Sequence, residues 1–73
     1  MKKFFNTSNK VDVILSVFND GEKLKGREIA RRIEDMGYRV NESSVKMFIY
    51  YHMMYQYLQK ERVNGVNYYY KLT

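Results

Sequence analysis

Near its C-terminus the chain has an Asn-Gly pair between two segments that favour β-strands. Asn64-Gly65 separates residues 57–63 from residues 66–72, and both segments carry tyrosine and valine. An Asn-Gly pair in this setting is the strongest short-range indication of a β-hairpin, because both residues of its type I′ turn need a positive φ. The pair therefore predicts a hairpin over residues 58–72 with a two-residue loop. That loop places Val63 opposite Val66, Glu61 opposite Tyr68 and Gln59 opposite Tyr70.

The two faces of this hairpin differ in chemistry, because side chains alternate between faces along a strand. One face is apolar and aromatic, and we expect it to pack on the core: Val66, Tyr68, Tyr70 and Leu72. The other face is polar and basic, and we expect it to be exposed: Lys60, Arg62, Asn67, Tyr69 and Lys71. Leu58 conflicts with this assignment, since it falls on the basic face. A bulge, or a helix that continues past Leu58, would resolve the conflict.

Apolar residues at helical spacing predict three helices before the hairpin, over about 8–20, 27–36 and 42–56. Thr7 or Ser8 is expected to cap the first helix, Gly37 to end the second and Asn41 to cap the third. A strand of two or three residues around Leu24 would fit between the first two helices. The sequence thus predicts one α+β domain over residues 1–73, with three helices and a C-terminal two-stranded hairpin.

The composition restricts the classes of function that we expect for this chain. The 73 residues carry a formal net charge of +5, which favours a polyanionic partner. The chain has no cysteine, and its single histidine, His52, has no carboxylate near it in sequence, so we expect no metal and no cofactor. We expect His52 to be half-buried on the apolar face of the third helix. No set of catalytic residues stands out, and an enzyme is not expected.

No apolar run reaches the ~20 residues that a membrane-spanning helix needs. The basic start of the chain is followed by Asn6-Thr7-Ser8-Asn9 rather than by the apolar stretch of a signal peptide. We therefore expect a cytoplasmic protein.

The order helix, short strand, helix, turn, helix, hairpin resembles the winged-helix branch of the helix-turn-helix proteins. Residues 26–45, GREIARRIEDMGYRVNESSV, are similar to the helix-turn-helix of MarR-like and PadR-like regulators. In that family an Ile-Ala pair opens the second helix, a glycine ends it, and a serine-rich cap starts the recognition helix. Residues 57–62, YLQKER, and 64–73, NGVNYYYKLT, resemble the wing. The resemblance implies a transcriptional regulator, such as a repressor, that binds double-stranded DNA.

Physical arguments select the residues that would contact DNA. The N-terminal part of a recognition helix approaches base edges in the major groove, and a basic hairpin can reach phosphates. Arg39 precedes the third helix, and Lys25 and Arg27 stand at the start of the second, where backbone N–H groups also point outward. The expected contact residues are Lys25, Arg27, Arg39, Ser43, Ser44, Lys46, Met47, Tyr50, Lys60, Arg62, Asn64 and Asn67.

The exposed side of the third helix also supports an alternative from another class. It is partly apolar, and Lys46 is its only charged residue beyond the cap. A protein-interaction module on the same fold, such as a viral or mobile-element adaptor or inhibitor, would bind its partner there, through Met47, Tyr50, Tyr51 and Met54.

We also expect a homodimer, because a lone module of this size contacts too few base pairs for useful specificity. Val13 and Val17 lie off the apolar stripe of the first helix, so they either widen the buried face or touch a second subunit. The adjacent Phe4 and Phe5 are poorly suited to remain in water. The expected dimer surface consists of these four residues.

Overall fold

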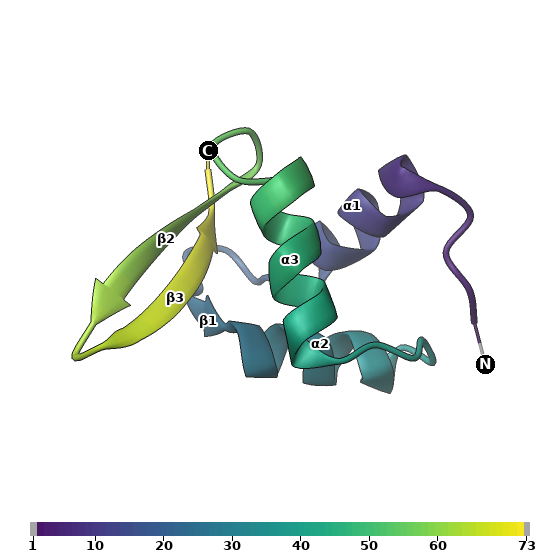
Figure 1. Ribbon diagram of the computed structural model, residues 1–73, viewed down its shortest axis with the longest axis horizontal. Coiled ribbons are helices and arrows are strands. Elements are labelled where there is room, and N and C mark those ends of the chain that lie inside the picture. Colours follow the sequence, from purple (N-terminus) through teal and green to yellow (C-terminus); the bar gives the residue numbers. More distant parts are fainter. Residues whose placement is uncertain (1, 73) are drawn as a thin grey trace.

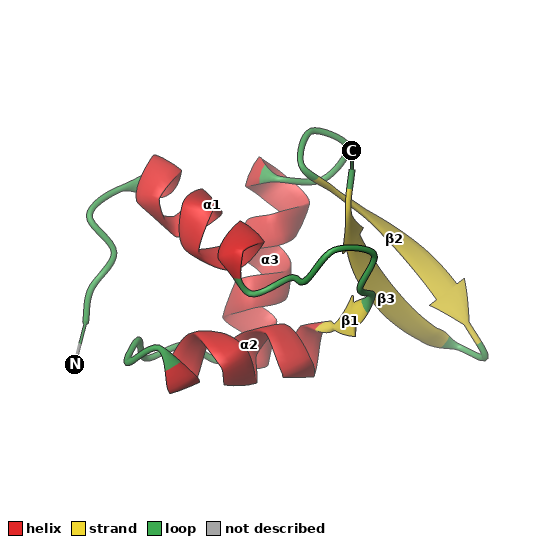
Figure 2. Ribbon diagram, turned by 180° about the vertical axis from the view of Figure 1, so that it is seen from behind, coloured by secondary structure: helices red, strands yellow, loops and turns green. Residues whose placement is uncertain are grey.

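The computed structural model describes residues 2–72, which form three helices and a three-stranded antiparallel sheet (Figures 1 and 2). Met1 and Thr73, the two ends of the predicted domain, lie outside the described residues. The elements in chain order are α1 (Thr7–Ser16), β1 (Leu24–Lys25), α2 (Gly26–Asp35), α3 (Glu42–His52), β2 (Leu58–Val63) and β3 (Val66–Lys71). The α+β class is confirmed. The prediction of a two-stranded hairpin is corrected, because β1 joins the hairpin and makes the sheet three-stranded, in the order β1-β3-β2.

The first helix differs from its predicted bounds at both ends. Its cap is Asn6, whose Oδ1 accepts a hydrogen bond of 2.8 Å from the Asn9 backbone N–H, and neither Thr7 nor Ser8 has that role. The helix ends at Ser16, four residues before the predicted end at residue 20. There the Arg32 guanidinium donates to the Val17 carbonyl at 2.8 Å, which satisfies a backbone acceptor at the helix end.

The second and third helices begin near their predicted positions. α2 matches its prediction to within one residue at each end, and Gly37 follows it with φ of 101°. The Asn41 side chain accepts from the Ser44 backbone N–H at 2.8 Å, which confirms Asn41 as the cap of α3. α3 ends at His52 rather than at residue 56. Tyr55, at a φ of 68°, leaves the helical conformation and donates from its backbone N–H to the Leu58 carbonyl at 2.8 Å.

The hairpin has the predicted register. Asn64 and Gly65 take φ values of 51° and 79°, as a type I′ turn requires, and Val63 lies opposite Val66. Gln59 lies opposite Tyr70 and Glu61 opposite Tyr68. On its other edge β3 pairs with β1, with Leu24 opposite Tyr69.

The predicted assignment of the hairpin faces is wrong. Leu58 and Tyr69 are buried, with exposed fractions of 0% and 4%, whereas Tyr68 and Tyr70 are only partly covered and Leu72 is exposed. At the base of the hairpin, the face that carries Lys60 and Arg62 is therefore the one that packs on the core. Leu58 and Tyr69 pack there together with Leu24 of β1, while Lys60 and Arg62 of the same face are exposed and Lys71 is partly covered.

The core lies where α1, α2 and α3 meet one another and the base of the sheet. Its fully buried side chains are Ile14, Leu24, Ile29, Ile33, Val45, Ile49, Met53 and Leu58. Figures 1 and 2 show α1 and the hairpin on opposite sides of α3, and α3 packs mainly against α2. None of the helices formed by residues 2–72 has the length and apolar character needed to cross a membrane.

The structure corrects the expected dimer surface. Val13 and Val17 belong to the core of this chain, each with 7% exposure, so they widen the buried face of α1 and are not free to meet a second copy. The Phe4 ring stacks on Tyr38 with centroids 4.4 Å apart. Phe5 is 91% exposed, and it is the one residue of the four that remains open.

Candidate nucleic-acid interface

A surface groove lies where the start of α2, the start of α3 and the tip of the hairpin meet. Its lining comes from three separate parts of the chain: Lys25, Gly26 and Arg27; Glu42 and Lys46; and Gly65, Val66 and Asn67. The strand pairing explains this meeting, because β1 places Lys25 opposite Tyr68 and then runs directly into α2. The groove thus brings together four of the predicted contact residues, namely Lys25, Arg27, Lys46 and Asn67.

Gly26 allows the two helix starts to approach closely. A Cβ atom at this position would lie 2.7 Å from Lys46 Cγ, which is too close for two carbon atoms. The absence of a side chain on Gly26 therefore lets the Lys46 stem cross the start of α2. The Lys46 ammonium lies 3.8 Å from a carboxylate oxygen of Glu42, one turn earlier on the same helix.

The basic residues of the hairpin face the same side as this groove. Arg62 lies directly opposite Asn67, and Lys60 directly opposite Tyr69. Opposite residues of an antiparallel pair project from the same face of the sheet. Because Asn67 lines the groove, Arg62 and Lys60 share its side, and both are exposed. Asn64 is exposed at the hairpin tip.

Seven of the 13 lysines and arginines form two groups near the sheet and α2 that differ in their carboxylate partners. The ion pairs that do not line the groove are Lys23 with Glu61, Arg32 with Glu22 and Lys71 with Asp20, at 2.5, 2.6 and 4.0 Å. Within residues 2–72, no carboxylate lies within 4.0 Å of the cationic groups of Lys25, Arg27, Lys60 and Arg62. We call the first three cations the paired set and the last four the open set. Five other cations, which also have no carboxylate within 4.0 Å among residues 2–72, belong to neither set: Lys2, Lys3, Lys10, Arg31 and Arg39.

Hydrogen bonding is strongest in the paired set. Arg32 donates to both carboxylate oxygens of Glu22, at 2.6 and 2.8 Å. These bonds, helped by the Asn19 backbone N–H, lower the pKa of Glu22 from 4.5 to about 2. The hydrogen bond from Lys23 to Glu61 likewise raises the pKa of Lys23. These contacts connect the α1–β1 loop to α2 and to the hairpin, so the paired set has a structural role.

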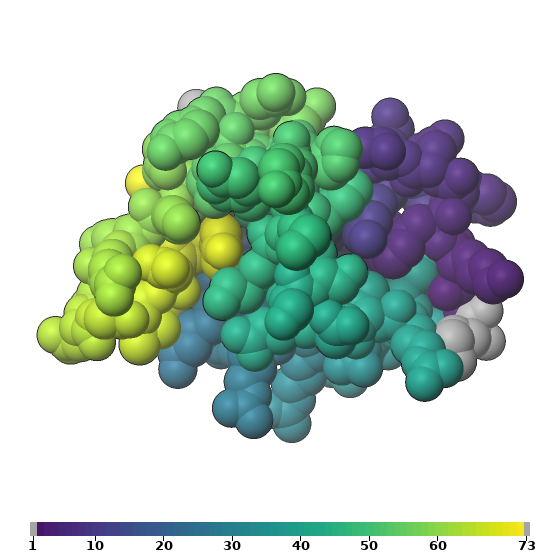
Figure 3. Space-filling model, viewed as in Figure 1, coloured from purple at the N-terminus to yellow at the C-terminus, as the bar shows by residue number. Residues whose placement is uncertain are grey.

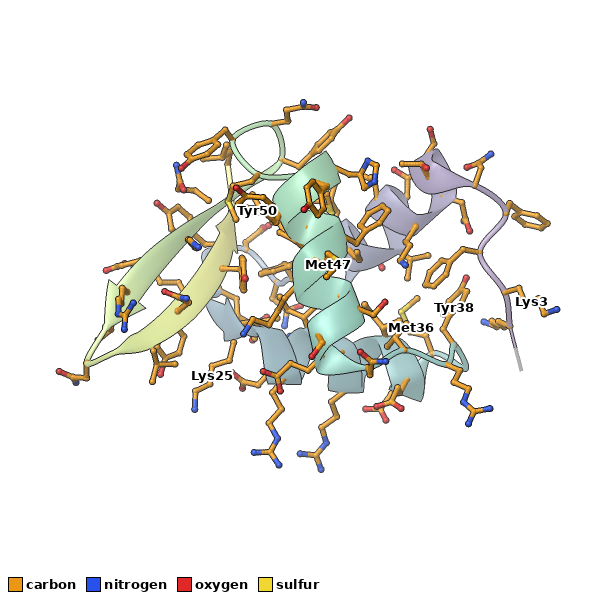
Figure 4. All side chains as sticks on the ribbon, viewed as in Figure 1. Lys3, Lys25, Met36, Tyr38, Met47 and Tyr50 are labelled. Carbon is orange, nitrogen blue, oxygen red and sulfur yellow. The ribbon has the colours of Figure 1, made fainter. Side chains whose placement is uncertain are left out.

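Beside the groove, α3 presents an exposed stripe (Figures 3 and 4). The stripe consists of Ser43, Lys46, Met47 and Tyr50, and Ser44 is exposed at its flank. Met47 and Tyr50 have exposed fractions of 61% and 65%. The Tyr51 ring, 70% exposed, meets Tyr50 edge to face with centroids 5.1 Å apart. Figure 3 shows α3 on the front of the molecule, between the hairpin and the N-terminal segment.

Three predicted positions lie elsewhere. Arg39 is exposed in the turn before α3 but does not line the groove. Met54, expected on the exposed side of α3, is half-buried against the core, because the helix has already ended and Met54 forms a bridge with Leu58. His52, expected to be half-buried, is exposed at the helix end, where its ring lies 4.6 Å from that of Phe48.

The sequence analysis did not select two basic residues that lie near these surfaces. Arg31 lines a shallow depression with Arg27 and Glu42, and its spacing of four residues from Arg27 on one helix could have indicated this. Lys10 of α1 lines another depression with Ser44, Met47 and Phe48. Nothing in the sequence pattern indicates that α1 and α3 approach each other there.

Among the residues that the structure describes, no three histidines or carboxylates gather as metal ligands would. Comparison of the chain with protein-family models, with curated proteins and with solved structures gives no match.

Proposed function

We propose that this protein is a winged-helix transcriptional regulator that binds double-stranded DNA. In this proposal α3 enters the major groove with its exposed stripe, and β2 and β3 form the wing, whose basic side contacts the backbone. Lys25 and Arg27 contact phosphates on the flank of the same site.

The observation that carries the proposal is the position of the open set around the groove and on the hairpin face next to it. Lys25 and Arg27 line the groove, and Lys60 and Arg62 project from the hairpin face that carries Asn67. Lys25 borders the groove from the edge strand β1, with its ammonium 5.9 Å from the centroid of the Tyr68 ring on the other face of the sheet. A cation without a protein carboxylate nearby can neutralise a phosphate and release the counterion condensed there, which favours binding. The exposed α3 stripe lies beside the groove, and an exposed helix side can enter the major groove of DNA.

The test is the binding of a random-sequence duplex of about 20 base pairs, followed by fluorescence anisotropy at increasing salt. If each residue of the open set contacts one phosphate, log affinity should fall linearly with log salt, with a slope of about −3.6. The absence of binding at low salt would contradict the proposal.

The second candidate is a protein-interaction module, favoured by the exposed apolar part of α3. Met47, Tyr50 and Tyr51 all have exposed fractions above one half: 61%, 65% and 70%. Exposed apolar patches of this kind often mark protein-binding surfaces. This candidate predicts no salt-dependent duplex binding. The homodimer also stays a prediction, and it requires a surface that does not include Val13 or Val17.

A further inference from the structure

The exposed side of α3 has one side chain, Lys46, of a type that recognises guanine or adenine through paired hydrogen bonds. Residues 42–52, ESSVKMFIYYH, contain no arginine, asparagine or glutamine. Arg or Lys bound to guanine and Asn or Gln bound to adenine are the usual two-bond contacts in the major groove, and Lys46 is the only residue of these types in the segment. If Lys46 contacts a phosphate, a sequence preference of this helix comes from other groups.

Lys46 is held towards the groove and away from the centre of the stripe. Its stem crosses Gly26, and its ammonium lies 3.8 Å from Glu42. It lines the groove together with Lys25 and Arg27. This position suits a phosphate contact beside the other cations, and it leaves the centre of the stripe to Met47 and Tyr50.

Met47 and Tyr50 form an apolar surface at that centre. They lie three residues apart, on one side of the helix, and Figure 4 shows both side chains on α3. The Tyr51 ring extends this surface, since it meets the Tyr50 ring edge to face with centroids 5.1 Å apart. The apolar group that the major groove offers to such a surface is the C5 methyl of thymine.

We propose that α3 selects DNA by the C5 methyl groups of pyrimidines, with Met47 as the principal contact and Tyr50 beside it. The inference rests on the proposed function, since it concerns the specificity of the same site. It assigns the phosphates to the open set and to Lys46, and the sequence preference to an apolar contact.

The test changes the DNA and leaves the protein intact. Four alternating duplexes of about 20 base pairs are compared: dA-dT, dA-dU, dG-dC and dG-d(5-methyl-C). Each pair differs only in the C5 methyl, so the phosphate contacts are constant. The protein should bind the methylated member of both pairs more tightly, by about fourfold for each buried methyl group.

Two methionine variants show whether Met47 is the contact. Met47→Ala should bring the ratio between the members of each pair close to one. Met36→Ala is the matched control, because Met36 is also exposed but stands at the end of α2, outside the stripe (Figure 4). It should keep the ratio of the parent protein. Thermal unfolding of both variants should match the parent, since both side chains are exposed.

The outcomes separate the inference from the proposed function. Equal affinity within each pair, or a ratio that Met47→Ala leaves unchanged, would overturn the inference and keep duplex binding. Failure to bind all four duplexes at low salt would overturn the proposed function and the inference together.

Discussion

The paired and open cations differ in what surrounds them, although they are close in sequence. Lys23 contacts Glu61, whereas Lys25, two residues later, lines the groove without a carboxylate within 4.0 Å among residues 2–72. On β2, Glu61 faces the side of Lys23, while its neighbours Lys60 and Arg62 face the groove side. The alternation of side chains along β2 thus places Glu61 on one face of the hairpin and the cations Lys60 and Arg62 on the other.

The largest effect should follow from removal of the open set. The variant Lys25→Ala, Arg27→Ala, Lys60→Ala, Arg62→Ala should bind duplex DNA several hundredfold more weakly near physiological salt, from roughly fivefold for each lost phosphate contact. Its melting temperature should stay close to that of the parent, because these side chains have no ion pair to lose. Anisotropy and thermal unfolding measure the two quantities. An unchanged affinity would show that the open set does not meet DNA.

Removal of a paired cation should lower the stability of the protein and leave its affinity for DNA unchanged. Arg32→Ala loses both hydrogen bonds to Glu22 and the bond to the Val17 carbonyl, which leaves these acceptors without their partner. The melting temperature should fall, and the duplex affinity of the folded protein should remain that of the parent. Lys3→Ala, a change at an exposed lysine of the N-terminal segment, is the control for the loss of one charge. A weakened affinity at full stability would place Arg32 in the interface instead.

The paired set should also make stability depend on pH. The folded pKa of Glu22 is about 2, below its ordinary value of 4.5, so folding favours the charged carboxylate. Its contribution to the free energy of unfolding is present above pH 4.5 and is lost as the pH falls towards 2. Denaturant unfolding across this range should show that the free energy of unfolding falls less on acidification for Glu22→Gln than for the parent. Identical acid profiles for the two proteins would contradict the role given to this pair.

The smallest effect should come from the carboxylate inside the groove. Glu42 lies 3.8 Å from Lys46 and would repel phosphates. Glu42→Gln should therefore raise duplex affinity by about twofold to fivefold, the scale of a single phosphate contact. It should slightly lower the melting temperature, since an acidic residue in the first turn stabilises a helix. Asp12→Asn on α1 is the matched control, and an equal gain there would indicate an effect of net charge alone.

The local parts of the fold could be predicted because short-range chemistry determines them. Asn41 caps α3 and Asn64-Gly65 sets the hairpin register, and each acts within a few residues of itself. The prediction missed Asn6 as the cap of α1, although Asn9 follows it by the spacing of a cap contact. It also extended α3 past His52, because Tyr55 gives no sequence indication of its positive φ.

The faces of the hairpin could not be assigned from composition. Tyr68-Tyr69-Tyr70 supplies aromatic rings to both faces, so alternation alone does not identify the buried one. Leu58, the residue that conflicted with the prediction, indicated the correct face, since it packs in the core with Tyr69. For the candidate site, Lys25 and Arg27 were predicted individually. Their meeting with Asn67 depends on the pairing of β1 with β3, a long-range contact that the pattern does not specify.

The salt dependence of duplex binding tests the central claim most directly when it is measured for two double variants. Lys25→Ala with Arg27→Ala removes two open cations, and Lys23→Ala with Lys71→Ala removes two paired ones, so both variants lose the same net charge. The account predicts that the first variant reduces the magnitude of the log–log slope by about 1.8, and that the second keeps the slope of the parent. Equal changes of slope in the two variants would contradict it, because the DNA would then respond to total charge and not to the groove.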